Sequence, residues 1–168
     1  ALRSASGFVI AERLTGNSGT DYGIPAMALA DDAGTLDSAE LQRLESILSA
    51  CWEALEGAAA AAHGKALRKG PRGGGRELVA ILEHVVDAHS GYLSMLGFQA
   101  APRGSQAALE YIVPLREASH EALKLAVAHE LPTVGPRGGK RWTPRYFVRR
   151  AAWHILDHAW EIEDRIVI

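Results

Sequence analysis

The sequence contains a single cysteine, Cys51, so no disulfide can form within the chain. No apolar run approaches the ~18 residues that a membrane-spanning helix needs, and the first residues lack the charged-then-apolar pattern of a secretion signal. The net charge is −2, so no excess of positive charge attracts nucleic acid or acidic membrane surfaces. These absences predict a cytoplasmic protein with neither a nucleic-acid partner nor a membrane partner.

Several catalytic motifs are also missing. The phosphate-binding pattern Gly-x4-Gly-Lys-Ser/Thr does not occur, which disfavours nucleotide binding. A His-Glu-x-x-His metalloprotease motif is excluded because Ile155 stands where the glutamate would be. Glu117 and His120 form the only Glu-x-x-His match, whereas a ferritin-like di-iron site would need two.

Four helical patterns fill most of the chain, and no stretch predicts a convincing sheet. The first begins at Asp37, with Glu40 completing a capping box, and the second ends at Gly97. The third covers about 105–129, and the fourth begins at Thr143-Pro144 and extends to about Arg165. We therefore expect an all-α protein. Residues 37–168 would form an antiparallel up-down four-helix bundle, and the breaker-rich residues 1–36 would form an irregular N-terminal arm.

Histidines on two of these helices are candidate metal ligands. His154 and His158 are four residues apart, so both imidazoles lie on one helical face and can reach one cation. His84 is about 8 residues into the second helix and His154 about 10 residues into the fourth, so we expect the two at matching depth from the loop end of the bundle. The remaining histidines are expected to be packed or exposed; they are His63, His89, His120 and His129.

A basic loop occurs twice, as Gly-Pro-Arg-Gly-Gly-Gly-Arg at 70–76 and Gly-Pro-Arg-Gly-Gly-Lys-Arg at 135–141. In an up-down bundle the two loops precede helices that point the same way, so their cations would meet at one end and hold an anion. The candidate anion-binding residues are Arg72, Arg76, Arg137, Lys140 and Arg141. The pattern is equally compatible with solvent-exposed loops that bind no ligand.

The motif His84-Val85-Val86 together with Trp153-His154-x3-His158 resembles the DinB/YfiT-like superfamily of metalloenzymes. The resemblance covers about 37–168 and implies a four-helix bundle in which His84, His154 and His158 bind a divalent metal. Asp87-Ala88-His89 is also similar to a stretch of that family, which leaves His89 as a substitute or additional ligand. Relatives of this kind include S-transferases and isomerases that use a low-molecular-weight thiol such as bacillithiol or mycothiol.

Two functional hypotheses follow. The first is a metal-dependent enzyme acting on a small anionic molecule, with Glu161 or Asp157 orienting a ligand histidine or moving a proton. Its metal could be zinc, nickel, iron or copper, because imidazole suits all four. The second is a non-catalytic bundle with a structural histidine network, in which Trp153 and Trp160 anchor a binding or homodimer interface.

Overall fold

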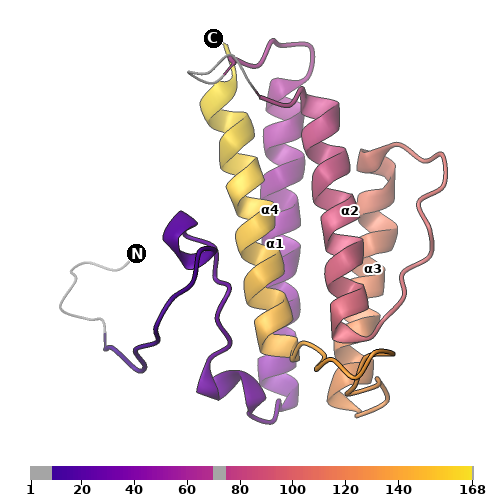
Figure 1. Cartoon of the computed structure of the whole chain (residues 1–168). Helices are drawn as coiled ribbons and strands as arrows, with labels where there is room; N and C mark the ends of the chain where they lie inside the picture. The colour runs from indigo at the N-terminus through magenta and orange to yellow at the C-terminus, as the bar shows by residue number, and fades with distance from the viewer. Residues whose placement is uncertain (1–8, 70–74, 168) are drawn as a thin grey trace.

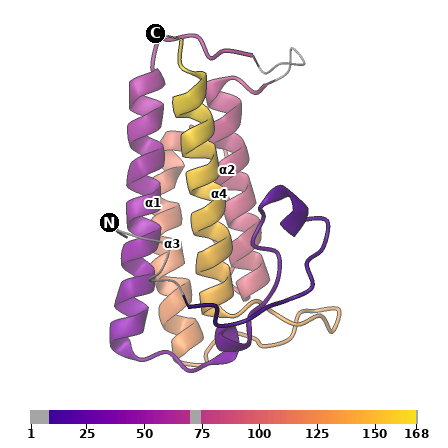
Figure 2. The same ribbon diagram turned by 90° about the vertical axis from the view of Figure 1, so that its left-hand side faces the viewer.

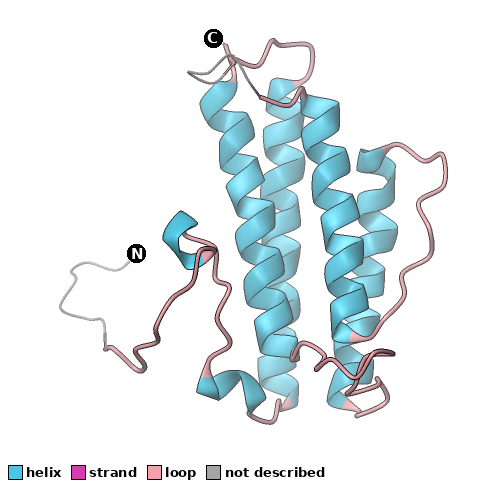
Figure 3. Cartoon of the chain, viewed as in Figure 1, coloured by secondary structure: helices cyan, strands magenta, loops and turns pink. Residues whose placement is uncertain are grey.

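A computed structural model describes residues 9–69 and 75–167, which fold as four long helices with two short 3-10 helices before them (Figures 1 and 3). The 3-10 helices are η2 (Thr20–Tyr22) and η3 (Ala30–Ala33). The long helices are α1 (Ser38–Ala62), α2 (Leu78–Leu96), α3 (Ala108–Val127) and α4 (Pro144–Arg165). The predicted all-α four-helix bundle is confirmed, and none of these helices combines the length and apolarity needed to cross a membrane.

Capping residues set three of the helix ends. The Asp37 side chain accepts a hydrogen bond from the Glu40 N–H at 2.8 Å at the start of α1. The Thr143 side chain accepts from the Tyr146 N–H at 3.4 Å before α4, where Pro144 occupies the first helical position. Gly97 ends α2 with a φ of 108°, which glycine adopts at little steric cost. The third helix begins at Ala108, later than the expected Ser105, and no side chain caps it.

The four helices enclose one core, in which each helix has two close neighbours. The neighbours of α1 are α4 and α3, and the neighbours of α2 are also α3 and α4. Large side chains from all four helices are fully buried between them, among them Trp52, Ile81, Leu115, Phe147 and Ile155. The face that α4 shares with α2 is the one that positions the candidate site.

The helix directions differ from the simple alternating order. The Arg68 N–H donates to the Arg165 carbonyl at 2.6 Å, and Arg145 pairs with Glu40 at 3.2 Å. Both ends of α1 and α4 therefore meet, and these two helices are parallel. The Trp142 N–H donates to the Met95 carbonyl at 2.9 Å, so the end of α2 meets the start of α4 and this pair is antiparallel.

The segment 97–107 explains this order. It runs along the outside of the bundle and returns the chain to the end at which α2 began, so α2 and α3 point the same way (Figure 1). A connection of this length can span roughly 35 Å when extended, more than the ~30 Å length of a 20-residue helix. The expected up-down order required this segment to reverse the chain direction, which is why it gave α3 the opposite direction.

The described part of the arm, residues 9–36, is anchored to the beginning of α4 (Figure 2). Asp32 in η3 is buried, and its two carboxylate oxygens accept hydrogen bonds from Arg149 at 2.6 and 2.7 Å. Burial alone would raise the pKa of Asp32, but hydrogen bonds from Arg149 and the Leu29 N–H outweigh it and hold the pKa below its ordinary value. A charged carboxylate thus attaches the arm to the bundle.

Candidate metal centre

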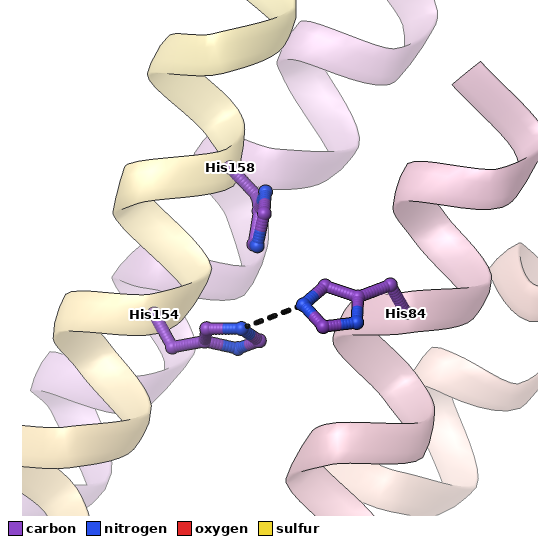
Figure 4. A group of neighbouring side chains, drawn as sticks. All are labelled: His84, His154 and His158. Atoms are coloured by element: carbon purple, nitrogen blue, oxygen red, sulfur yellow. Dashed lines mark hydrogen bonds between the residues drawn. The ribbon is translucent and has the colours of Figure 1, made fainter. Parts of the chain in front are cut away.

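Three histidine side chains converge between α2 and α4 (Figure 4). His84 comes from α2, and His154 and His158 come from successive turns of α4. One ring nitrogen from each lies within 4.8 Å of those from the other two, and the three ring centroids are 4.7 to 5.1 Å apart. The structure therefore brings together the three residues singled out in the sequence, and such a group could hold a metal ion.

The reason that they meet is different from the expected one. Because α2 and α4 are antiparallel, depth must be counted from the start of α2 and from the end of α4. His84 lies six residues after Leu78, and His158 lies seven residues before Arg165. The two histidines lie at the same height along the bundle, because His84 is in the first half of α2 and His158 is in the second half of α4.

One pair of ring nitrogens is spaced as two metal ligands would be. The Nε2 atoms of His84 and His154 are 3.2 Å apart. Two nitrogens bound tetrahedrally to zinc at ~2.0–2.1 Å would be separated by roughly 3.3 Å. A hydrogen bond between two neutral imidazoles has a similar length, so the distance fits both a pair of metal ligands and a direct hydrogen bond.

Glu161 fixes the orientation of His158. Its Oε2 lies 2.7 Å from His158 Nδ1, while its Oε1 accepts a 2.6 Å hydrogen bond from Arg165 Nη1. With a proton on Nδ1 donated to this carboxylate, the lone pair of His158 is on Nε2. A carboxylate that holds the second nitrogen of a histidine is a recurrent feature of protein metal sites.

Burial favours the neutral, metal-binding form of His154 and His84. Desolvation, followed by the neighbouring His158 and His84, lowers the pKa of His154 to about 3. Desolvation is also the main cause that lowers the pKa of His84, and the charge of Arg76 adds to it. His154 Nδ1 is buried without a hydrogen-bond partner among the described residues. The donor set therefore fits a divalent cation, because neutral imidazole is the ligand form.

Two neighbours of the site were not predicted as site residues. Tyr92 of α2 places its ring 5.6 Å from the His154 ring, with an edge-to-face geometry. The guanidinium of Arg150 lies 5.5 Å from the ring of Tyr92 and 5.4 Å from that of Trp153. The spacing of Arg150, four residues before His154, could have indicated its position. The position of Tyr92 depends on the antiparallel packing of α2, which the sequence does not specify.

Asp157 and His89 do not join the cluster. Asp157 is exposed and has no hydrogen bond or ion pair within the described residues, so only Glu161 of the two predicted carboxylates contacts a cluster histidine. His89 points into the core, where its Nε2 lies 2.7 Å from the Ser119 hydroxyl. His120 is also outside the cluster, with its Nε2 3.4 Å from the Ser49 hydroxyl.

The prediction that the two basic loops converge is wrong. Arg76 is at the start of α2, where its carbonyl accepts from Arg165 at the end of α4. Arg141 is at the opposite end of the bundle, where its Nη1 donates to the carbonyl of Ser94 near the end of α2. The antiparallel packing of α2 and α4 separates Arg76 from Arg141 by the length of the bundle. Arg72 lies outside the described residues, while Arg137 and Lys140 are exposed near Arg141.

Comparison of the chain with protein-family models, with curated proteins and with solved structures found no match. The resemblance to the DinB/YfiT-like superfamily therefore stays a prediction from the sequence. The convergence of His84, His154 and His158, by contrast, is a property of the structure itself.

Proposed function

We propose that the protein binds a divalent metal ion through His84, His154 and His158 and is an enzyme that acts at that ion on a small anionic molecule. The observation that carries this proposal is the convergence of three imidazole nitrogens within 4.8 Å of one another between two helices. Three protein ligands leave a position open for a substrate or water, the arrangement that distinguishes catalytic from structural zinc sites.

Each residue around the cluster has a role in this proposal. His154 supplies a buried ligand whose pKa of about 3 keeps it neutral at physiological pH. Glu161 orients His158 and is the group placed to accept or return a proton, and Arg165 holds Glu161 in position. A bound divalent ion would supply Lewis acidity, which lowers the pKa of a coordinated thiol or water. Zinc, nickel and iron all accept imidazole ligands.

The charges around the cluster favour an anionic substrate. Arg76 and Arg150 both contribute to lowering the pKa of His154, which places their positive charges close to the cluster. Glu161 and Asp87 oppose these charges at His84, and the charge of Glu161 is shared with Arg165. Because histidine binds metals through a neutral imidazole, a bound divalent ion would add further positive charge. By resemblance to the DinB/YfiT-like superfamily, we propose a low-molecular-weight thiol as the co-substrate in a transfer or isomerisation.

A non-catalytic bundle is the competing proposal. The 3.2 Å separation of the His84 and His154 nitrogens also fits a direct hydrogen bond in a structural network. Trp160 on α4 is 58% exposed and could contribute to a homodimer interface. The two proposals differ in whether metal is bound, which can be measured directly.

Metal content provides the test. Protein purified without a histidine tag or chelator should contain about one divalent ion per chain by mass spectrometry of the elements. His154→Ala should lose that ion, whereas His120→Ala, a matched change outside the cluster, should keep it. Metal that stays far below one ion per chain after reconstitution, or that persists in His154→Ala, would refute the metal site. If metal is bound, thiols should be screened with electrophilic organic acids.

A further inference from the structure

A separate cavity lies at the end of the bundle where α4 begins. Its volume is about 580 Å³, within the range of roughly 300–1,000 Å³ that is typical of small-molecule sites. Residues 32–36 of the arm, residues 126–134 around the end of α3, and residues 140–145 leading into α4 form most of its walls. Three segments distant in sequence thus enclose a space of ligand size.

Much of this wall is apolar. Leu36 comes from the arm, Leu96 from the end of α2, and Leu131 from the loop after α3. Trp142 adds an aromatic surface, and its orientation is fixed by Tyr92 and Tyr146, whose ring centroids are 5.2 and 4.9 Å away. Such walls suit an acyl or aryl group better than a bare inorganic ion.

The acidic side chain of the lining is already neutralised. Asp32 is held by both terminal nitrogens of Arg149, so its charge is compensated. Among the cations of the lining, Arg145 is similarly committed to Glu40 and to the carbonyl oxygens of Asp31 and Gly34.

Two cations of the lining lack an acidic partner in the described parts of the chain. Lys140 forms no ion pair there, and the hydrogen bond of Arg141 is to a backbone carbonyl, that of Ser94. The Nε of Arg141 is buried and without a hydrogen-bond partner among those residues. An anion in the cavity that pairs with these uncompensated cations would therefore be stabilised.

We infer that this cavity is a binding site for a small organic acid. The carboxylate of the ligand pairs with Lys140 and Arg141, and its apolar body lies against Leu36, Leu131 and Trp142. Thr143, the cap of α4, is eleven residues before His154, which places this wall of the cavity roughly 16 Å from the histidines. The site is distinct from the proposed metal centre, and binding there does not require a metal.

The test compares an acid with its uncharged analogue. Calorimetric titration of the full chain with 4-phenylbutyrate should show saturable binding, at least about tenfold tighter than for 4-phenylbutyramide. The variant Lys140→Met/Arg141→Met should bind the acid at least about tenfold more weakly. Lys124→Met removes a positive charge from the exposed last turn of α3, outside the lining, and should bind as the wild type does.

A second variant separates the cavity from its charges. Ala126→Phe keeps every charge but fills part of the space, so it should also weaken binding, while thermal unfolding verifies that each variant is folded. The inference is overturned if 4-phenylbutyrate fails to saturate at millimolar concentrations, or if the amide binds equally well. Binding that survives in folded Ala126→Phe, or inorganic phosphate that binds as tightly as the acid, would likewise overturn it.

Discussion

His89 and His154 are two buried histidines with similar local properties and different neighbours. His89 is 1% exposed and His154 is 7% exposed, and burial lowers the pKa of both to about 3. Each also has a buried Nδ1 without a hydrogen-bond partner in the described structure. Burial and a depressed pKa therefore do not separate a structural histidine from a candidate ligand.

The difference is in what each ring faces. The Ser119 hydroxyl donates to the Leu115 carbonyl at 2.7 Å, so its oxygen is left to accept from the Nε2–H of His89. Trp52 and Phe147 cover the ring of His89, with centroids 5.0 and 5.5 Å away. His154 instead faces two other imidazoles. The comparison teaches that converging nitrogen lone pairs, rather than an unusual pKa, mark the candidate site.

The largest expected difference comes from removing each ring. His154→Ala should weaken metal binding by more than about 100-fold, since even a residue that only orients a ligand contributes roughly 10–100-fold. His89→Ala should keep metal affinity but lower the free energy of unfolding by about 3 kcal/mol, because it leaves a cavity beside Trp52 and Phe147. Competition with a chromophoric chelator and urea unfolding would measure these effects. Equal effects of both variants on metal affinity would contradict the assignment of His154 as a ligand and His89 as a structural residue.

The pH dependence of stability should reveal the role of His89. Its pKa is about 3 in the folded protein and near 6.5 when solvated, so the unfolded chain binds the extra proton between these values. The stability that His89 contributes as a neutral group is present above pH 6.5 and is lost as pH falls towards 3, by up to about 1.4 kcal/mol per pH unit. His89→Leu should reduce this slope by up to about 1.4 kcal/mol per pH unit, which corresponds to one proton. Urea unfolding of the metal-free protein at pH 7, 6 and 5 would measure the change. An unchanged slope would show that His89 is not buried as a neutral ring.

The partners of the two kinds of histidine offer a finer comparison. Glu161→Ala removes the carboxylate that orients His158 and should weaken metal binding roughly 10–100-fold. Ser119→Ala removes the hydrogen-bond partner of His89 and should lower the free energy of unfolding by about 1–2 kcal/mol with no change in metal affinity. The same chelator competition tests both. Metal affinity that is insensitive to Glu161→Ala would mean that His158 is not oriented through its Nδ1.

Local sequence patterns predicted much of the fold and the identity of the cluster. The caps at Asp37 and Thr143 and the glycine at position 97 mark helix ends because they act through hydrogen bonds or dihedral angles close in sequence. The i,i+4 spacing of His154 and His158 fixes their common face in the same local way. The sequence named Glu161 or Asp157 as the carboxylate that orients a ligand histidine, and the i,i+3 spacing of His158 and Glu161 accounts for the contact that forms.

Features that depend on helix direction were not predictable. An amphipathic pattern specifies which face of a helix is buried, but not which helix covers it or in which direction that helix runs. The reversal of α3 depends on residues 97–107 extending along the bundle, and its consequence is that the loops containing Arg76 and Arg141 lie at opposite ends. The histidines still meet, because His84 in the first half of α2 lies beside His158 in the second half of the antiparallel α4.

The smallest expected effect is a loss of stability from a substitution at the end of α2. Gly97 ends α2, the helix that carries His84 and His89, with a φ of 108°. An added Cβ would lie 3.2 Å from the carbonyl oxygen of Pro132, and the left-handed conformation is itself unfavourable for alanine. Gly97→Ala should therefore lower the free energy of unfolding by about 1–2 kcal/mol in urea.

Metal affinity should change little in Gly97→Ala, because Gly97 lies thirteen residues beyond His84 and the middle of α2 is fixed by packing on α3 and α4. Leu82→Ala, at a buried position closer to the cluster, provides a larger loss of stability of about 2–5 kcal/mol for comparison. A large loss of metal affinity in Gly97→Ala alone would show that the end of α2 sets the position of His84. The contrast between a ligating and a structural histidine would then depend on the register of the whole helix, and not only on the neighbours of each ring.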